Sequence, residues 1–219
     1  FFGVMLHAGT LIAVLFAYFS RIKEILLRDR KMIFYLAAAT LPAALVGYFF
    51  GDAIDELFFG GRYLPVFFAL TAVLLFAAEK RSKKPHLLRP VGIKTSLIAG
   101  AAQALAVIPG LSRSGTTLSA CIFAGTEREE AADFSFLMSI PIIAGAIFAE
   151  LLKAFSGNAF AVQISWLSLA VGTLTAAICG FLSIKLVQRC VKKGSLYGFC
   201  VYLFILAIFV PFLTKLGVL

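Results

Sequence analysis

Charged residues are scarce in this chain of 219 residues. They make up 14% of the sequence, whereas hydrophobic residues make up 61%, and a soluble domain averages nearer one half. This balance excludes a soluble globular domain and predicts an integral membrane protein. The sequence shows no secretory signal peptide. Because it begins at Phe1, inside an apolar run and without a methionine, we expect its natural N-terminus to lie upstream.

Acidic residues are the rarer of the two charged kinds, 11 against 20 basic ones, and the formal net charge is +9. This excess does not indicate nucleic-acid binding, because the basic residues lie in short segments between apolar runs, as in the cytoplasmic loops of membrane proteins. The four cysteines show no metal-ligand spacing. We interpret them as small apolar side chains in packed or lipid-facing helices.

Long apolar runs are abundant. Six of them predict spanning helices, at about 1.5 Å of rise per residue across a ~30 Å hydrocarbon core, and they lie at 1–19, 33–51, 63–78, 134–152, 163–184 and 196–214. The basic segments 20–32, 79–94 and 185–195 separate them and are assigned to the cytoplasm. His7 lies within the first span. We favour a histidine hydrogen-bonded to a neighbouring helix over one that faces a site.

A polar stretch interrupts the apolar sequence before the last three spans. It holds a helix-breaking proline, two glycines, four hydroxyls and an arginine, namely Pro109, Gly110, Ser112, Arg113, Ser114, Gly115, Thr116 and Thr117. Arg113 cannot lose its proton and is costly at bilayer depth without an anionic partner. Amides, hydroxyls and a guanidinium all donate hydrogen bonds. The stretch therefore predicts a loop that binds phosphate within the membrane.

The segment 95–125, which holds this loop, must cross the membrane an even number of times, because the two spans that follow it already return the chain to the cytoplasmic side. It is too short for two full spans. We therefore predict a re-entrant hairpin, with helices at about 95–107 and 115–125 and a break at Pro109 and Gly110, lining a cavity. The hairpin enters from the cytoplasm, which favours a site open to the outside.

An internal repeat gives a second view of the architecture. Residues 36–47 and 169–180 are identical at seven of twelve positions. One segment runs outward and the other inward, which predicts an inverted-topology repeat. The expected fold is an all-α polytopic bundle with one membrane domain, whose halves are 1–94, with three spans, and 95–219, with the hairpin and three spans. The repeat offset of 133 residues places a counterpart of the hairpin before Phe1.

The segment from Pro109 to Thr117 resembles the undecaprenyl-pyrophosphate phosphatase family of bacteria, also called bacitracin-resistance proteins. All six specified positions of the family signature Pro-Gly-x-Ser-Arg-Ser-x-x-Thr match, and the likeness covers essentially the whole chain. The family also has an N-terminal catalytic segment with two glutamates four apart and a Ser-Ser-Thr-Gly-His run. No such segment occurs here, and His7 lies beyond where it should end.

The resemblance implies removal of one phosphate from undecaprenyl pyrophosphate in the bacterial cytoplasmic (inner) membrane, which recycles the lipid carrier of cell-wall synthesis and gives bacitracin resistance. In this reaction Arg113 would clamp the phosphate oxygens, and the hydroxyls would donate hydrogen bonds to them. The expected catalytic residues are Arg113, Ser112, Ser114 and Thr117. The expected substrate-binding residues are Gly110, Gly115, Thr116 and Gln103.

A divalent cation, magnesium or calcium, is also expected. Its glutamate ligands would lie before Phe1, so we expect no metal ligand in this chain. The rival function is a transporter or flippase of an anionic phosphorylated lipid. The sequence shows no buried carboxylate pair, which by itself favours a carrier, whereas the family resemblance favours a hydrolase. The expected partners are a polyprenyl pyrophosphate lipid and the bilayer, without nucleic acid, and the sequence leaves a homodimer open.

Overall fold

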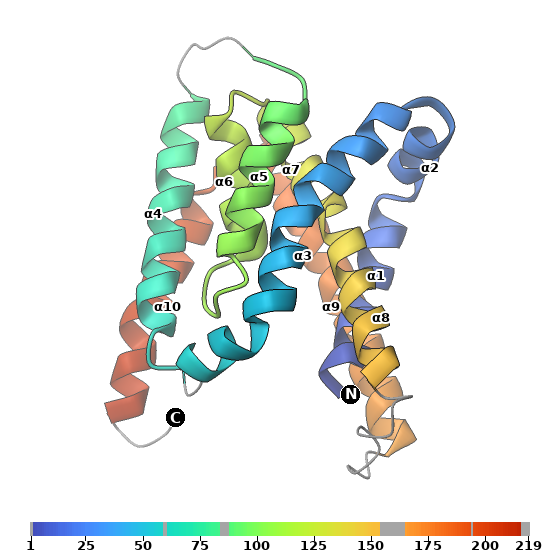
Figure 1. The fold of residues 1–219 in the computed structure, drawn as a ribbon. Helices are drawn as coiled ribbons and strands as arrows, with labels where there is room; N and C mark the ends of the chain where they lie inside the picture. Colours follow the sequence, from blue (N-terminus) through green and yellow to red (C-terminus); the bar gives the residue numbers. More distant parts are fainter. Residues whose placement is uncertain (1, 59–60, 84–87, 154–164, 194, 216–219) are drawn as a thin grey trace.

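The computed structural model describes residues 2–58, 61–83, 88–153, 165–193 and 195–215, and the regular elements within these ranges are all α-helices (Figure 1). In chain order they are α1 (Phe2–Ala17), α2 (Phe19–Arg28), α3 (Arg30–Phe58), α4 (Leu64–Ser82), α5 (Ile93–Leu105), α6 (Arg113–Phe123), α7 (Arg128–Leu137), α8 (Ser139–Lys153), α9 (Trp166–Lys193) and α10 (Tyr197–Lys215). The predicted all-α fold class is confirmed.

Segments that the sequence places between the predicted spans are helical, and they include residues 185–193 at the end of α9. The basic segment 20–32 contains most of α2, which buries Ile25 to 3% exposure while its charged side chains stay at the surface. It is an amphipathic helix rather than a loop. The acidic segment 127–133, which precedes the predicted span 134–152, mostly belongs to α7. Its first turn carries Glu129 and Glu130, whose charges favour a helix N-terminus.

Among the described residues, three helical stretches are long and apolar enough to cross a membrane: Arg30–Phe58, Arg128–Ala149 and Trp166–Lys192. The apolar helical stretches Met5–Ala17 and Tyr197–Leu213 are shorter. Large hydrophobic side chains also face outward around the molecule, as Phe16, Tyr48 and Trp166 do with at least three quarters of their surface exposed. Such an apolar exterior is what lipid solvates, so the chain is a multi-pass membrane protein.

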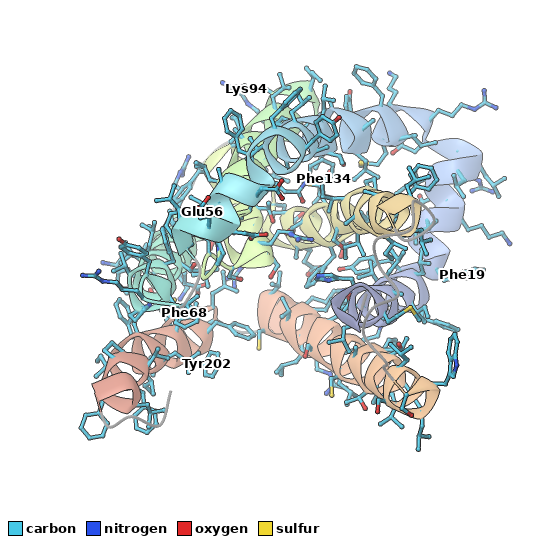
Figure 2. The ribbon with its side chains drawn as sticks, turned by 60° about the horizontal axis from the view of Figure 1, so that its bottom comes forward. Phe19, Glu56, Phe68, Lys94, Phe134 and Tyr202 are labelled. Carbon is cyan, nitrogen blue, oxygen red and sulfur yellow. The ribbon has the colours of Figure 1, made fainter. Side chains whose placement is uncertain are left out.

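The helices lie side by side and pack in a few main pairs (Figure 1). On one side α4 contacts α6 and α10, on the other α1 contacts α8 and α9, and α3 packs on α5 between them. Figure 2, turned by 60° from this view, shows Phe134 among the helices and Phe19 at the periphery. Phe134 is 1% exposed and belongs to the core, whereas Phe19 is 68% exposed.

Small residues allow the backbones of α3 and α5 to approach closely. Gly100 on α5 lies against Ala39 on α3, and a Cβ built at Gly100 would lie 2.7 Å from the Ala39 carbonyl oxygen. Ala39 and Ala99 are fully buried. Because lipid offers apolar side chains as good an environment as the protein does, close backbone packing is a main source of helix association in membranes. The contact therefore fixes α5, and with it the loop that follows.

α5 and α6 form a hairpin whose two ends meet. The Arg89 amide, before α5, donates to the Gly125 carbonyl, after α6, at 3.0 Å. The Val91 amide donates to a Glu130 carboxylate oxygen at 3.0 Å. The helices have 13 and 11 residues, so each is about 20 Å long or less. They begin two residues earlier than predicted. In Figure 1 the loop that joins them lies near the lower end of α4, where Gly110 lies against Leu64 and Phe67 of its first turn.

A buried carboxylate joins three helices at the end of the bundle that carries the α4–α5 connection. Glu79, near the end of α4, has a fully buried side chain. Its oxygens lie 3.0 Å from Lys83 Nζ and 3.0 Å from Arg128 Nη2, and they accept the Leu196 amide at 3.1 Å. Lys83 directly follows α4, Arg128 is the first residue of α7, and Leu196 directly precedes α10. The cluster therefore fixes the start of α7, which packs on α6.

Candidate functional site

The loop between α5 and α6 is held in shape by its own residues and by α4. Ser112 is the N-cap of α6, and its hydroxyl accepts the Gly115 amide at 3.2 Å, as N-cap serines do. The Ser112 amide donates to Thr71 Oγ1 of α4 at 3.2 Å. Gly110 has φ +95°, a conformation that only glycine adopts without strain. The sequence predicts a break in the helix at this glycine, and the positive φ of Gly110 explains it.

A cavity of about 480 Å³ opens beside this loop. One wall is the loop, the start of α6 and part of α7, which present Arg113, Ser114 and Ser135. The facing wall is formed by α1, α8 and α9, which present His7, Thr10, Ser139 and Ser183. No carboxylate is among the described residues that line it. The cavity thus combines cationic and hydrogen-bonding groups, and this composition suits an anion.

The start of α6 adds its own partial charge to this wall. Arg113 is the first residue of the helix, and both Arg113 and Ser114 expose their side chains. The first amides of a helix have no partner within it, and the helix dipole places positive potential at this end. Guanidinium, hydroxyl and backbone amides therefore converge on the same cavity.

Thr117 lies behind this wall and not in the cavity lining. Its side chain is fully buried, and its hydroxyl lies 2.9 Å from the Arg113 carbonyl and 2.5 Å from the Ser135 hydroxyl. The Ser135 hydroxyl also lies 3.3 Å from the Ser114 carbonyl. These contacts connect α7 to the first turn of α6. Thr117 and Ser135 are therefore placed to fix the backbone that carries Arg113 and Ser114.

Four other predicted residues take up different places. Ser112 and Gly115 line a second cavity of about 180 Å³, mostly apolar, which shares Ser114 and Ser135 with the first. Gly110 lines the first cavity. Thr116 is 6% exposed and lines neither. The predicted residues thus form one segment around the α6 N-terminus, but not all of them reach the cavity.

Gln103 lies apart from the cavity. It is 1% exposed on α5, and its Nε2 donates to the Ala39 carbonyl of α3 at 3.5 Å. It is not among the residues lining the larger cavity. Its position suits helix packing rather than contact with an anion in that cavity, so its predicted substrate contact has no support in this arrangement.

His7, Ser135, Ser139 and Ser183 line the cavity but were not predicted as site residues. For His7 the sequence favoured a hydrogen bond to another helix. The structure instead places its side chain at the cavity, with no side-chain hydrogen bond to any described residue. The signal that could have identified it is its ionisable ring within a membrane span. The three serines could not be identified as cavity residues from the sequence, because serines are common in membrane helices.

The residues described here do not by themselves fit a divalent cation. Magnesium and calcium bind oxygen ligands, carboxylates above all. No group of three or more potential His, Cys, Asp or Glu ligands occurs in the described part of the chain. An acidic cluster lies at the start of α7 around Glu129 and Asp133, in a separate cavity of about 230 Å³.

Comparison with known proteins bears on this site. Residues 1–209 match the family described as "Bacitracin resistance protein BacA". A relative from Moorella thermoacetica, named undecaprenyl-diphosphatase, is 38% identical over 214 residues, which cover 94% of this chain and 80% of the relative. An undecaprenyl-diphosphatase from Halothermothrix orenii is 34% identical over 214 residues, covering 96% and 82%. One from Methanobrevibacter smithii is 35% identical over 231 residues, covering 95% and 82%.

Proposed function

Because the chain belongs to the bacitracin resistance protein BacA family, we propose that its larger cavity carries out the reaction for which its relatives are named, the hydrolysis of undecaprenyl pyrophosphate. Water adds to the terminal phosphorus, and the bond between this phosphorus and the bridging oxygen breaks. The bridging oxygen leaves with undecaprenyl phosphate, inorganic phosphate is released, and a proton passes to solvent. The observation that supports this proposal is that Arg113 and Ser114 line one cavity at the N-terminus of α6.

The residues of this wall can stabilise the charge of the transferred phosphoryl group. Phosphoryl transfer needs positioning and electrostatic stabilisation more than covalent chemistry. Arg113 supplies a planar fork of donors that matches two phosphate oxygens, and Ser114 and the first amides of α6 supply further donors. Thr117 and Ser135 hold this turn from behind.

The lipid part of the substrate suits the exterior of the protein. The outward faces of the helices are apolar, and the polyprenyl chain can lie along them within the bilayer. The setting is the bacterial cytoplasmic membrane, where the product serves again as a carrier of cell-wall precursors. Removal of the pyrophosphate lipid accounts for bacitracin resistance in the family's name.

The proposal includes the membrane placement of the hairpin. α5 and α6 are shorter than a membrane span, and the hydrogen bond from Arg89 to Gly125 brings the ends of the hairpin together, which supports a re-entrant arrangement. Helices α4 and α10 start 133 residues apart and end 133 residues apart. This coincidence supports the inverted repeat of 1–94 and 95–219.

The proposal also includes a divalent cation, magnesium or calcium. When bound, such an ion would neutralise phosphate charge and polarise the phosphoryl group. No carboxylate is among the described residues that line the cavity, so the proposed ion takes its ligands from outside this lining. The role proposed for Arg113 does not depend on the ion.

The test is phosphate release from undecaprenyl pyrophosphate by the purified protein in detergent, measured with magnesium, calcium or a chelator. Arg113→Ala is expected to lower turnover by about 100-fold or more, as loss of a transition-state donor does, while the protein stays folded. Arg113→Lys is expected to be poor, because lysine lacks the planar fork.

Near-wild-type turnover of Arg113→Ala would remove this cavity from the reaction. Binding of the lipid without phosphate release, with either cation, would instead favour the transporter or flippase. Ser168→Ala is a suitable control, because Ser168 is exposed on α9 and lines none of the cavities described here.

A further inference from the structure

The wall of the larger cavity that faces Arg113 has no role in the function proposed so far. It is built from α1, α8 and α9 and presents the His7 imidazole, the Thr10, Ser139 and Ser183 hydroxyls, and the backbone at Gly180. Arg113 and His7 both line this cavity. The two nitrogen-bearing side chains of the cavity thus lie on elements that are distant in sequence, α1 and α6.

The His7 ring is exposed in the structure. The backbone carbonyl of His7 accepts the Thr10 hydroxyl at 2.8 Å. In the described part of the chain its ring has no hydrogen-bond partner and no carboxylate neighbour in the cavity. An ionisable side chain within a membrane helix is costly, and it usually faces a partner or a functional cavity. The partner expected here is a ligand.

We propose that His7 is a second anion-binding residue, and that His7 and Arg113 together hold the two phosphates of one diphosphate group. This inference rests on the proposed function and names how the site recognises its substrate. Arg113, with the α6 N-terminus, binds one phosphate. His7 donates an imidazole N–H to an oxygen of the other, with Ser139 and Ser183 beside it.

The arrangement separates a diphosphate from a monophosphate. A diphosphate extends from one wall to the other and meets both donors, whereas a monophosphate meets the stronger cationic wall and leaves His7 unused. The substrate therefore gains a contact that neither inorganic phosphate nor the lipid monophosphate makes. Such a difference in contacts is the physical basis of specificity, and it also favours release of products.

The experiment is calorimetric titration of the purified protein in detergent with inorganic pyrophosphate and, separately, with inorganic phosphate. Loss of one hydrogen bond to a charged group is worth about 1.5–3 kcal/mol, so His7→Leu is expected to weaken pyrophosphate binding by about 10- to 100-fold. Phosphate binding should change by less than about 2-fold. His7→Gln retains an N–H donor and should stay near wild type for both anions.

Control variants show whether a change in anion binding is specific to His7. Arg113→Ala should weaken both anions, and Ser168→Ala neither. If His7→Leu does not fold, as judged by thermal unfolding, His7→Ala takes its place. Unchanged pyrophosphate affinity in a folded His7 variant, an equal loss for both anions, or no pyrophosphate binding by the wild type would each overturn the role of His7. If Arg113→Ala left the affinity for both anions unchanged, the proposed site itself would be overturned, independently of the results for His7.

Discussion

At the scale of single residues, the site depends on what lies behind Arg113 as much as on Arg113. The first turn of α6 carries a charge that must keep a fixed direction inside a membrane protein. Thr117 and Ser135 hold that turn through hydroxyl contacts to its carbonyl oxygens. The sequence predicted Thr117 as a direct participant, and its buried position suggests support of the backbone instead.

Ser135 gives a test of this support. Ser135→Ala removes the contact to Thr117 Oγ1 and to the Ser114 carbonyl, and we expect it to lower kcat about 10-fold, from a loss of about 1.4 kcal/mol, with a smaller change in KM. Ser135→Thr keeps the hydroxyl and should recover most of the activity. The measurement is steady-state phosphate release from undecaprenyl pyrophosphate.

The matched control is Ser119→Ala. Ser119 is also buried, but its hydroxyl donates to the Gly115 carbonyl of its own helix at 2.7 Å and lines neither cavity. We expect the Ser119→Ala variant to keep nearly the wild-type turnover. Equal losses for the two variants would mean that any buried serine near α6 matters only for packing.

At the scale of the helices, the buried carboxylate of Glu79 joins α4, α7 and the start of α10. Removing one member of a buried ion pair leaves the other charges without compensation and typically costs 3–5 kcal/mol. We expect Glu79→Gln to destabilise the protein by about 3 kcal/mol, measured as the free energy of unfolding in detergent, while the folded fraction keeps its activity.

A second acidic residue of the same region serves as the comparison. Glu129 pairs with Lys192 at 3.5 Å, and both side chains are about half exposed. An exposed pair contributes only about 0–1 kcal/mol, so Glu129→Gln should have little effect on unfolding. If the two variants lost the same stability, burial would not be what makes Glu79 important.

At the scale of the whole molecule, the proposed topology places both ends of the α5–α6 hairpin on one side of the membrane. The reason is that Arg89 and Gly125 are joined by a backbone hydrogen bond, while α5 and α6 are too short to cross. Single cysteines at Arg89, Glu127 and Arg62, introduced after replacement of the native cysteines, can be labelled in intact cells with a reagent that does not cross membranes.

We expect the cysteines at positions 89 and 127 to be protected from the outside and the one at position 62 to be labelled. Position 62 lies between the end of α3 and the start of α4, and Figure 1 shows these two helix ends at the opposite end of the bundle from the start of α5. Labelling of 89 and 127 from opposite sides would mean that this segment crosses the membrane an odd number of times, and the re-entrant arrangement would be wrong.

The sequence by itself determined the class of the protein and the segment that carries its site. Apolar runs of membrane length can only be helices in lipid, because backbone groups must be satisfied within the segment. Arg113 and its hydroxyl neighbours were recognisable because a permanent charge at membrane depth needs a partner. Both inferences depend on local composition, which the sequence contains in full.

Only the tertiary structure decided what faces that segment. His7 and Arg113 are 106 positions apart in the chain, and no periodicity or spacing indicates that α1 and α6 share a cavity. Likewise Gln103 has the chemistry of a site residue, yet its helix face turns it toward Ala39. Which side of a helix meets which neighbour is set by packing between distant segments, through contacts as specific as Gly100 on Ala39, and such contacts form only in the folded bundle.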